Sequence, residues 1–303
     1  MDERTTEFEQ HRGRLFGIAY RMLGSRADAE DMVQEAYLRW HETNADAVRS
    51  SEAWLVTVVT RLCIDRLRAA SVERERYIGP WLPEPIAVGP APSPEATAAL
   101  ASSLSLAFLT LLERLSPEER AAFLLHDVFD CDYPAIARIL GKREAACRQM
   151  VHRARGRVRR DRPRFEANHQ EQRRLLEQFR EAMHVADEGA LRALFAADIT
   201  LASDGGGKAP AATNILTGIE RVARLFGGVA RKWHGRLRYS PTTVNGEPGL
   251  VMWHEDQPRS VLVIEAAPGA RIGSIYQQMN PDKLRDLVDR LHHGGTHGTH
   301  RLS

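Results

Sequence analysis

The sequence predicts a multidomain protein: two all-α domains, the second containing a helix-turn-helix, followed by an α+β domain. Three observations predict this organisation. Apolar residues at helical spacing continue to about residue 160, a proline-rich break at 79–94 interrupts them, and short alternating runs replace them after residue 168. A chain of 303 residues is long enough for two or three domains, each with its own core.

The composition is that of an ordinary globular protein, with 43% apolar and 27% charged residues. No apolar run approaches the ~20 residues that span a bilayer, and residues 1–10 are polar and acidic rather than signal-like. We therefore expect no membrane association and a cytoplasmic location. Cys63, Cys131 and Cys147 are widely spaced within apolar helical patterns, which indicates neither disulfides nor a zinc site. No metal or cofactor is expected.

The first helical domain is expected at 5–75. Ser25 and Asp28 form a capping signal before a helix that continues to Trp40. A polar loop at 43–50 precedes a second amphipathic helix that extends to Leu67. The buried stripe of this second helix is Trp54, Leu55, Val58, Val59 and Leu62, and its opposite stripe is Arg61, Asp65 and Arg68.

A linker is expected at 76–96, since six prolines at 80–94 abolish periodicity. The string WLPEP at 81–85 lies inside it. Trp81 and Leu82 are apolar side chains that a solvated tether does not need, which suggests a linker docked on another surface. Chance composition is the alternative.

The second helical domain is expected at 97–162 and contains the helix-turn-helix, at 133–160. Pro134 lies in the first turn of a short helix, Gly141 supplies the turn, and a longer helix follows from about Arg143. Its apolar stripe is Cys147, Val151, Ala154 and Val158, and the adjacent stripe is Arg148, His152, Arg155 and Arg159. Residues 142–164 carry a net charge of +8 in a chain whose total is +2. This concentration of charge on one element predicts phosphate neutralisation and hence DNA binding.

The third domain is expected at 168–291. A helix at 171–186 precedes alternating runs that predict a curved antiparallel sheet. These runs are 199–202, 237–244, 250–254, 260–266 and 271–279. The Gly, His and Thr-rich tail at 292–303 is expected to be flexible.

The two helical domains resemble a bacterial transcription factor family. Residues 28–40 resemble the polymerase-binding helix of sigma-70-type factors, and Leu115 to Arg120 with the helix-turn-helix resembles their fourth region. The two-domain layout is similar to that of extracytoplasmic-function (ECF) sigma factors. The remainder is similar to SnoaL-like domains of the NTF2-like cone fold. WLPEP at 81–85, DGGGK at 204–208 and NPDKL at 280–284 are similar to strings of the ECF subgroup that carries such a domain at its C-terminus.

The resemblance implies a non-enzymatic sigma factor that directs promoter-specific initiation and is regulated in cis by its SnoaL-like domain. The implied partners are the RNA polymerase core enzyme and promoter DNA. An alternative is a DNA-binding regulator whose SnoaL-like domain senses or converts a small molecule. Association with core polymerase discriminates between them.

The resemblance also implies roles for individual residues. Core polymerase is expected to bind Glu30, Asp31, Gln34 and Glu35, and residues 1–47 carry a net charge of −4 that suits a basic partner. Promoter DNA is expected to contact two groups of residues. The helix that approaches the minus-ten element carries Arg61, Asp65 and Arg68, and the recognition helix for the minus-thirty-five element carries Arg143, Arg148, Gln149, His152 and Arg153, with Arg155 beside them. The 43–50 loop matches the one that captures a flipped base in this family.

A regulatory contact is expected among the three strings. Its members are Trp81, Leu82, Pro83, Asp204, Gly205, Gly206, Gly207, Lys208, Asn280, Pro281, Asp282, Lys283 and Leu284. The glycines do not form a Walker A motif, because Ala202 and Ala209 occupy positions where it requires Gly and Ser or Thr. A tight turn is favoured instead. Scattered titratable residues, including His254, form no recognisable catalytic set, so we expect no catalysis, while a small-molecule ligand in this domain stays open.

Overall fold

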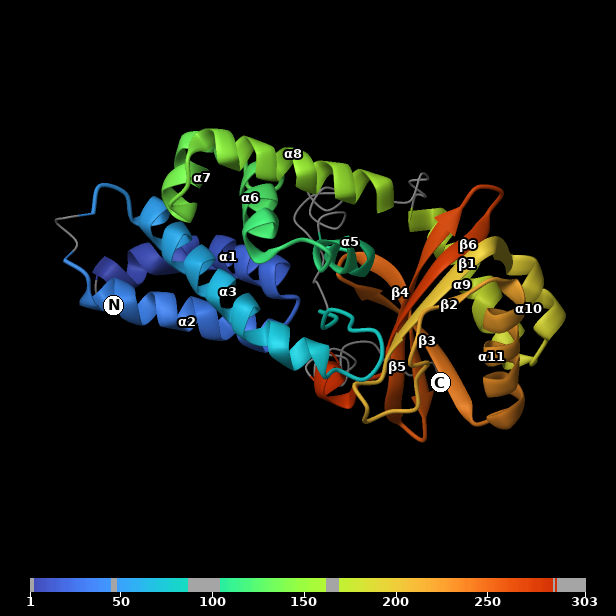
Figure 1. Cartoon of the computed structure of the whole chain (residues 1–303). Helices are drawn as coiled ribbons and strands as arrows, with labels where there is room; N and C mark the ends of the chain where they lie inside the picture. Colours follow the sequence, from blue (N-terminus) through green and yellow to red (C-terminus); the bar gives the residue numbers. More distant parts are fainter. Residues whose placement is uncertain (1–2, 45–47, 87–103, 162–168, 286, 288–303) are drawn as a thin grey trace. The chain divides into compact units, whose positions relative to one another are not determined.

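The computed structural model describes residues 3–44, 48–86, 104–161, 169–285 and 287 (Figure 1). The chain divides into two compact units. Unit 1 contains residues 1–76 and 109–162, and unit 2 contains residues 77–108 and 163–303. Unit 1 thus contains residues 5–75 and 109–162 of the expected helical domains, whereas residues 104–108 of the second helical domain and 77–86 of the expected linker belong to unit 2. The remainder of that linker (87–96) and the tail at 292–303 lie outside the described residues.

Unit 1 is helical, as its amphipathic patterns predict. Its N-terminal part consists of α1 (Glu3–Leu23), α2 (Arg26–Glu42) and α3 (Ser51–Glu75). Ser25 caps α2 by accepting a hydrogen bond from the Asp28 backbone N–H, and Ser50 caps α3 in the same way at Ala53. Val33, Trp40 and Val59 are among the core side chains that these helices bury. The expected loop at 43–50 connects α2 to α3, and its residues 45–47 lie outside the described structure.

The C-terminal part of unit 1 consists of α6 (Pro117–Asp127), α7 (Tyr133–Leu140) and α8 (Glu144–Asp161). Ser116 and Glu119 form a complete capping box at the start of α6. Gly141 ends α7 with a φ of 63°, the left-handed conformation that glycine adopts without a steric cost. The stripe predicted to be apolar on α8, Cys147, Val151, Ala154 and Val158, is buried. The helix α5 (Leu106–Leu112) spans the division between the units.

Unit 2 is an α+β fold built on one six-stranded sheet. Its helices are α9 (His169–His184), α10 (Glu188–Leu194) and α11 (Ile219–Lys232). Its strands are β1 (Phe195–Asp204), β2 (Leu216–Thr217), β3 (Leu237–Val244), β4 (Glu247–His254), β5 (Gln257–Ala267) and β6 (Arg271–Gln278). The strand order is β2-β1-β6-β5-β4-β3.

One pairing in this sheet differs from the expected antiparallel arrangement. Strands β1 and β6 are parallel, with Leu201 opposite Ile275, whereas the other neighbours are antiparallel. Alternation of apolar residues reports which face a side chain occupies but not the direction of the neighbouring strand, so the sequence pattern missed this pair.

The two faces of the sheet bury different clusters. The helices α9, α10 and α11 lie over one face (Figure 1), where Phe179, Phe195 and Phe226 pack with Leu262 and Ile264. On the other face Val251, Val261 and Val263 pack with Leu106 and with residues after β6. Alternate residues of β5 thus point to opposite clusters, as the period of a strand requires. Unit 2 therefore holds residues from before α6 on a sheet built from the C-terminal third of the chain.

Candidate functional site

The residues predicted to bind core polymerase lie on the outer face of α2. Asp31 and Gln34 are exposed, while Glu30 pairs with Arg12 at 2.9 Å and Glu35 pairs with Arg39 at 2.8 Å. All four lie off the buried stripe of Ala29, Val33, Ala36 and Trp40.

Leu38 extends this surface and was missed from the sequence. Its side chain is 50% exposed, which is unusual for a large apolar residue on a helix whose other face is buried. It lies two turns along from Asp31 and one turn along from Gln34 and Glu35, and hence on the same face. The helical spacing of the acidic residues was the available signal. We call Glu30, Asp31, Gln34, Glu35 and Leu38 the α2 surface.

The α3 residues predicted to contact promoter DNA face α6 and α7 of the same unit. Arg61 donates from Nε to the Ile139 carbonyl at 2.8 Å and from Nη2 to the Arg138 carbonyl at 3.1 Å. Arg68 pairs with Glu118 at 2.5 Å and with Asp65 at 3.1 Å. The Arg61 and Arg68 guanidinium groups are thus engaged by the helix-turn-helix part of unit 1.

A buried arginine and a partly buried one join the two helical parts of unit 1. Arg120 on α6 is 2% exposed and donates to the Met22 carbonyl at 2.6 Å and to Glu113 at 2.7 Å. Arg74 on α3 also pairs with Glu113. Burial lowers the pKa of Arg120 to about 9 and, together with the nearby Arg120 charge, that of Arg74 to about 10. Burying a charged guanidinium group costs free energy unless carbonyl or carboxylate partners compensate it. The contact between the two helical parts of unit 1 is therefore specific.

The predicted DNA-binding residues of α8 form an exposed basic surface. Arg148, Gln149, His152 and Arg153 line a shallow depression of about 390 Å³, and Arg143 is exposed just before the helix begins. Arg148 is held by Glu144 at 2.8 Å and lies over the Tyr133 ring with its guanidinium carbon 4.8 Å from the centroid. This arrangement presents cationic and amide groups on one helix face, as reading base edges requires.

Three arginines of α8 are oriented by carboxylates of α6. Arg153 and Arg157 both donate to Glu119, at 3.0 and 2.6 Å, and Arg155 pairs with Asp127 at 2.7 Å. Burial raises the pKa of the Glu119 carboxyl, but hydrogen bonds from Arg153 and Ser116 and the Arg157 charge outweigh it, so the net pKa is lowered. Arg153 remains half exposed and is positioned rather than withdrawn.

Within unit 2 the three sequence strings come together around the carboxylate of Asp204, which is fully buried at the end of β1. Its Oδ1 accepts from the Tyr77 hydroxyl at 2.5 Å, and its Oδ2 accepts from the Leu82 backbone N–H at 2.9 Å and from Lys283 Nζ at 2.7 Å. Lys283 also donates to the Leu82 carbonyl at 2.6 Å. We call Tyr77, Trp81, Leu82, Asp204 and Lys283 the linker anchor.

The linker side chains pack against the same groups. The Lys283 ammonium lies 4.1 Å from the centre of the Trp81 ring and 5.0 Å from that of Tyr77. Leu82 is 1% exposed, and the Gln278 side-chain amide donates to the carbonyls of Leu82 and Pro83. Burial raises the pKa of the Tyr77 hydroxyl, and its hydrogen bond to Asp204 raises it further, so the hydroxyl stays protonated as a donor.

The DGGGK turn leaves no room for side chains at its glycines. A Cβ on Gly206 would lie 2.2 Å from Asn280 Nδ2, and one on Gly207 would lie 2.9 Å from the Ile78 side chain. Gly206 and Gly207 also have positive φ values of 57° and 70°. On Gly205 the Cβ would meet the Ala209 carbonyl at 2.4 Å. The glycines therefore let the linker and the 280–284 segment approach the turn closely.

The 280–284 segment completes this arrangement. Asn280 Nδ2 donates to the Tyr77 hydroxyl at 3.0 Å, and Asn280 Oδ1 accepts from the Asp282 backbone N–H. Lys208 at the end of the turn pairs with Asp282, with both side chains largely exposed. Leu284 packs with the Val251, Val261 and Val263 cluster of the sheet, and Pro281 lines a cavity of unit 2.

Asn245 is a second attachment point that sequence reasoning missed. Its side-chain Oδ1 accepts from the Ile86 N–H at 2.9 Å, its Nδ2 donates to the Leu104 carbonyl at 2.8 Å, and its backbone N–H donates to the Ile86 carbonyl. It is fully buried and has a φ of 52°, a conformation that Asn tolerates better than most residues. The Asn-Gly pair between β3 and β4 was a visible hairpin signal, but nothing in it indicated a distant partner.

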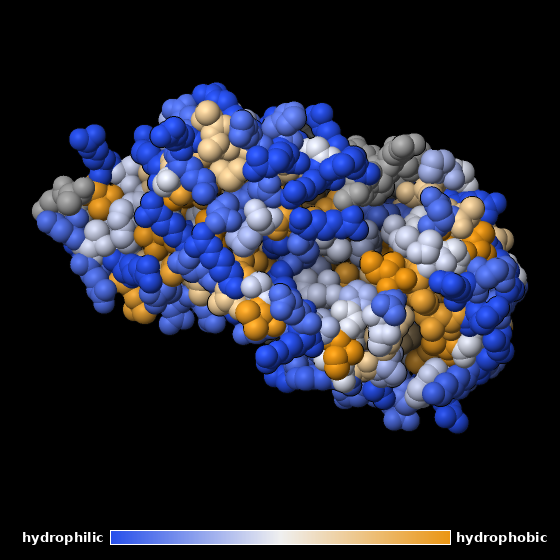
Figure 2. Space-filling model, viewed as in Figure 1, coloured by the Kyte–Doolittle hydropathy of each residue, from blue (hydrophilic) through white to orange (hydrophobic). Residues whose placement is uncertain are grey.

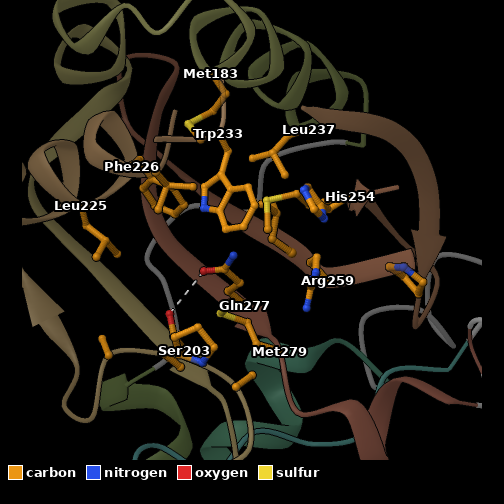
Figure 3. Close-up of a pocket in the computed structure, with 18 of the residues that line it drawn as sticks. Met183, Ser203, Leu225, Phe226, Trp233, Leu237, His254, Arg259, Gln277 and Met279 are labelled. Carbon is orange, nitrogen blue, oxygen red and sulfur yellow. Dashed lines mark hydrogen bonds between the residues drawn. The ribbon is translucent and has the colours of Figure 1, made fainter. Parts of the chain in front are cut away.

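A cavity of about 1160 Å³ lies between the sheet and its helices in unit 2 (Figure 3). His254 and Trp233 line it, whereas Trp253 packs on the opposite face of the sheet. None of the described lining residues is an Asp or a Glu, so this part of the chain supplies the cavity with no carboxylate for general acid or base chemistry.

The described residues contain no group of three or more His, Cys, Asp or Glu side chains that could hold a metal ion. The three cysteines are free thiols, two buried and one partly buried. Among the described helices, none is long and apolar enough to cross a membrane.

Comparison with known proteins identifies the helical unit. The family model for Sigma-70 region 2 matches residues 8–72, and the model for Sigma-70, region 4 matches residues 105–158. These matches coincide with α1 to α3 and with the segment that contains α6 to α8. The class of protein is therefore that of sigma-70-type transcription factors.

Individual relatives identify the subfamily of sigma-70-type factors to which the chain belongs. The ECF RNA polymerase sigma factor SigJ of Mycobacterium tuberculosis is 36% identical over 294 residues, which is 92% of each chain. Its crystal structure matches with a TM-score of 0.74 at 33% identity and covers 93% of this chain and 98% of that chain. The probable ECF RNA polymerase sigma factor SigI of the same species is 37% identical over 159 residues, 52% of this chain and 54% of its own. The chain belongs to the ECF sigma factors of RNA polymerase, and it functions in promoter-specific transcription initiation.

Proposed function

We propose that unit 2 regulates the sigma unit in cis by holding the linker between the two sigma regions. The observation that carries this proposal is the linker anchor. A buried carboxylate, Asp204, and a nearly buried ammonium, Lys283, both bind the backbone of Leu82. Residue 82 lies between the region 2 and region 4 matches, so the anchor fixes the chain that joins the two promoter-binding regions.

The anchored linker acts at high effective concentration. Tyr77 follows the end of α3 by two residues, and an intrachain contact on so short a tether works at an effective concentration of roughly millimolar. Even a weak interface therefore shifts the population between two arrangements of the sigma regions. The attachment of Ile86 and Leu104 to Asn245 supports the same function, because these residues flank the remainder of the linker.

The packing within unit 1 supports a closed arrangement that must open on initiation. Arg61 and Arg68, expected to approach the minus-ten element, are bound by the α7 carbonyls and by Glu118. They cannot contact DNA and these partners at once. We propose that release of the linker favours separation of α3 from α6 and α7, which frees both guanidinium groups from these partners.

The α2 surface is proposed to bind core polymerase, and the α8 surface to bind the minus-thirty-five element. The net charge of −4 at residues 1–47 and the exposed Asp31, Gln34 and Leu38 support the first assignment. The exposed Arg148, Gln149 and His152 support the second. Both partners, core enzyme and promoter DNA, follow from membership of the sigma family.

The test is in-vitro transcription with purified core polymerase and a template that carries the gene's own upstream region. Lys283→Met and Trp81→Ala are expected to raise transcript yield several-fold by loosening the linker, whereas Lys208→Met, which breaks an exposed pair, leaves it unchanged. Equal yields from all four proteins would refute regulation through the anchor. Failure of the unmodified chain to bind core polymerase would instead favour a DNA-binding regulator that acts without it.

A further inference from the structure

The cavity of unit 2 is apolar inside and basic at its rim. It is formed by α9, α11, strands β1 and β3 to β6, and the segments at 208–212 and 279–285. Its volume of about 1160 Å³ is at the upper end of the range of small-molecule sites, which is roughly 300–1000 Å³. Figure 3 shows Met183, Phe226, Trp233 and Leu237 directed toward one another from different elements.

Seven aromatic or methionine side chains are among the described lining residues. Phe226, Trp233, Met252 and Met279 are among them, and methionine is the side chain that best adapts to varied apolar shapes. The polar groups inside are neutral. The Ser203 hydroxyl lies 3.4 Å from Gln277 Oε1, and the buried Tyr239 hydroxyl has no hydrogen-bond partner among the described residues. The interior thus favours the apolar body of a ligand with at most a few neutral polar groups.

The charged residues that line the cavity are all basic. Among the described lining residues five are Lys or Arg and none is Asp or Glu. Lys208 and Arg285 pair with Asp282. Arg224, Lys232 and Arg259 are exposed and form no ion pair with any described residue. An apolar interior beneath three uncompensated cations is complementary to a molecule with an apolar body and one anionic end.

We propose that this cavity is a binding site for an amphiphilic anion, a carboxylate with an extended or polycyclic apolar body. The body occupies the space among Phe226, Trp233 and Met252, and the carboxylate lies at the rim near Arg224 and Arg259. Among the described lining residues His254 is the one histidine, and none is a carboxylate.

The same two chain segments line the cavity and hold the linker, so occupancy is coupled to the linker anchor. Lys208 ends the DGGGK turn and begins the 208–212 segment of the lining. In the other segment the lining residues Met279, Pro281 and Leu284 are interspersed with Asn280 and Lys283, which bind Tyr77 and Leu82. The 279–285 segment therefore contacts both the ligand site and the linker. This consequence rests on the proposed cis regulation, whereas the binding site itself does not.

Binding is tested by isothermal titration calorimetry of the full chain. The ligands are dodecanoate, dodecanol and dodecyltrimethylammonium, with each surfactant below its critical micelle concentration. Dodecanoate is expected to bind most tightly, and octanoate and decanoate to bind more weakly by up to about fourfold per CH₂ removed. Cholate replaces dodecanoate in a parallel arm, and the tighter of the two identifies an extended or a polycyclic body. Absence of binding by both carboxylates, or equal binding of the cation, would overturn the proposal.

Substitutions in the cavity lining test whether the ligand binds in this cavity. Gly228 lines it, and a Cβ built at this position meets nothing within 4 Å, so Gly228→Leu fills the space without a clash in the helix. It is expected to weaken the tighter carboxylate at least tenfold, with Gly228→Ala intermediate. Arg259→Gln and Arg224→Gln are expected to weaken the carboxylate about threefold to fivefold each and to leave dodecanol unchanged. Arg221→Gln on the same helix, outside the cavity lining, is the matched control.

The binding site and its coupling to the linker anchor are refuted by different results. Unchanged affinity in Gly228→Leu, measured on a variant whose melting temperature is at least that of the parent, would show that the ligand binds elsewhere. If the affinities change as expected but saturating carboxylate alters neither transcript yield nor hydrogen exchange at Leu82, the site stands and its coupling to the linker is wrong.

Discussion

Unit 2 contains two Lys–Asp pairs between the same two strings, one buried in the linker anchor and one exposed beside it. In the first, Lys283 and Asp204 have side chains that are 14% and 0% exposed. In the second, the Lys208 and Asp282 side chains are 58% and 40% exposed. Both pairs join the DGGGK string to the NPDKL string, so a methionine at either lysine removes the same charge and keeps a similar length. Burial is the variable that differs.

Lys283→Met leaves the Asp204 carboxylate buried without its only cationic partner among the described residues. Removing one member of a buried pair typically costs about 3–5 kcal/mol, because the remaining charge is uncompensated. Asp204 keeps hydrogen bonds from Tyr77, Leu82 and Gly206, so we expect the lower end of that range, about 3 kcal/mol. Lys208→Met removes a solvated pair and is expected to cost less than about 1 kcal/mol.

Amide hydrogen exchange at Leu82 measures this difference locally, because its N–H donates to Asp204 and exchanges when the linker detaches. A loss of about 3 kcal/mol corresponds to an exchange rate that rises by roughly two orders of magnitude in Lys283→Met. In Lys208→Met the rate is expected to change by less than about fivefold. Similar exchange rates in the two variants would refute the argument that the buried pair secures the linker.

Three further predictions concern the DNA-binding residues of α8, the α2 surface and Glu247 of unit 2. Arg148→Ala should weaken promoter binding by about 1–3 kcal/mol with a loss of sequence preference, whereas Arg159→Ala should weaken all sequences alike and flatten the salt dependence by about one unit; equal sequence-independent losses in filter binding would make Arg148 a phosphate contact. Asp31→Lys should abolish pull-down of core polymerase without lowering the melting temperature, while Glu9→Lys, an exposed acid on α1, should leave it intact; retained pull-down by Asp31→Lys would remove α2 from the interface. Burial, and secondarily the charge of a nearby glutamate, raises the pKa of Glu247 from 4.5 to about 8, so the folded state retains a proton that the unfolded state has lost. Its stability contribution is therefore complete below about pH 4.5 and declines as the pH rises toward 8; Glu247→Gln should flatten the fall of melting temperature between pH 5 and pH 8, and an unchanged slope would assign that fall to other groups.

The helical part of the fold was predictable because its signals are local. The capping box at Ser116, the glycine at 141 and the stripe from Cys147 to Val158 each act within a few residues, and the structure has them as expected. Alternation likewise predicted β1 and β3 to β6 of unit 2, whereas the two-residue strand β2 and the helices α10 and α11 were not predicted. The direction of β1 relative to β6 was not predictable, since alternation specifies faces and leaves strand direction open.

Long-range partners explain what the sequence could not provide. Arg61 reads as a solvated residue on α3, and only the tertiary structure shows that the carbonyls of Arg138 and Ile139 accept its hydrogen bonds. Tyr77 carried no motif, and the Asn-Gly pair at Asn245 indicated only a hairpin, although each of these residues binds a partner more than a hundred positions away. The cavity likewise arises from residues on seven elements and two connecting segments, whose convergence no local pattern reports.

The most direct test of the central claim is run-off transcription by core polymerase with the full chain, Lys283→Met and Lys208→Met on the gene's own upstream region. We predict a specific transcript from the full chain and from Lys208→Met, and a several-fold higher yield from Lys283→Met. A transcript of equal yield from all three proteins would contradict regulation through the linker anchor, and the absence of any transcript above core polymerase alone would contradict initiation at this promoter.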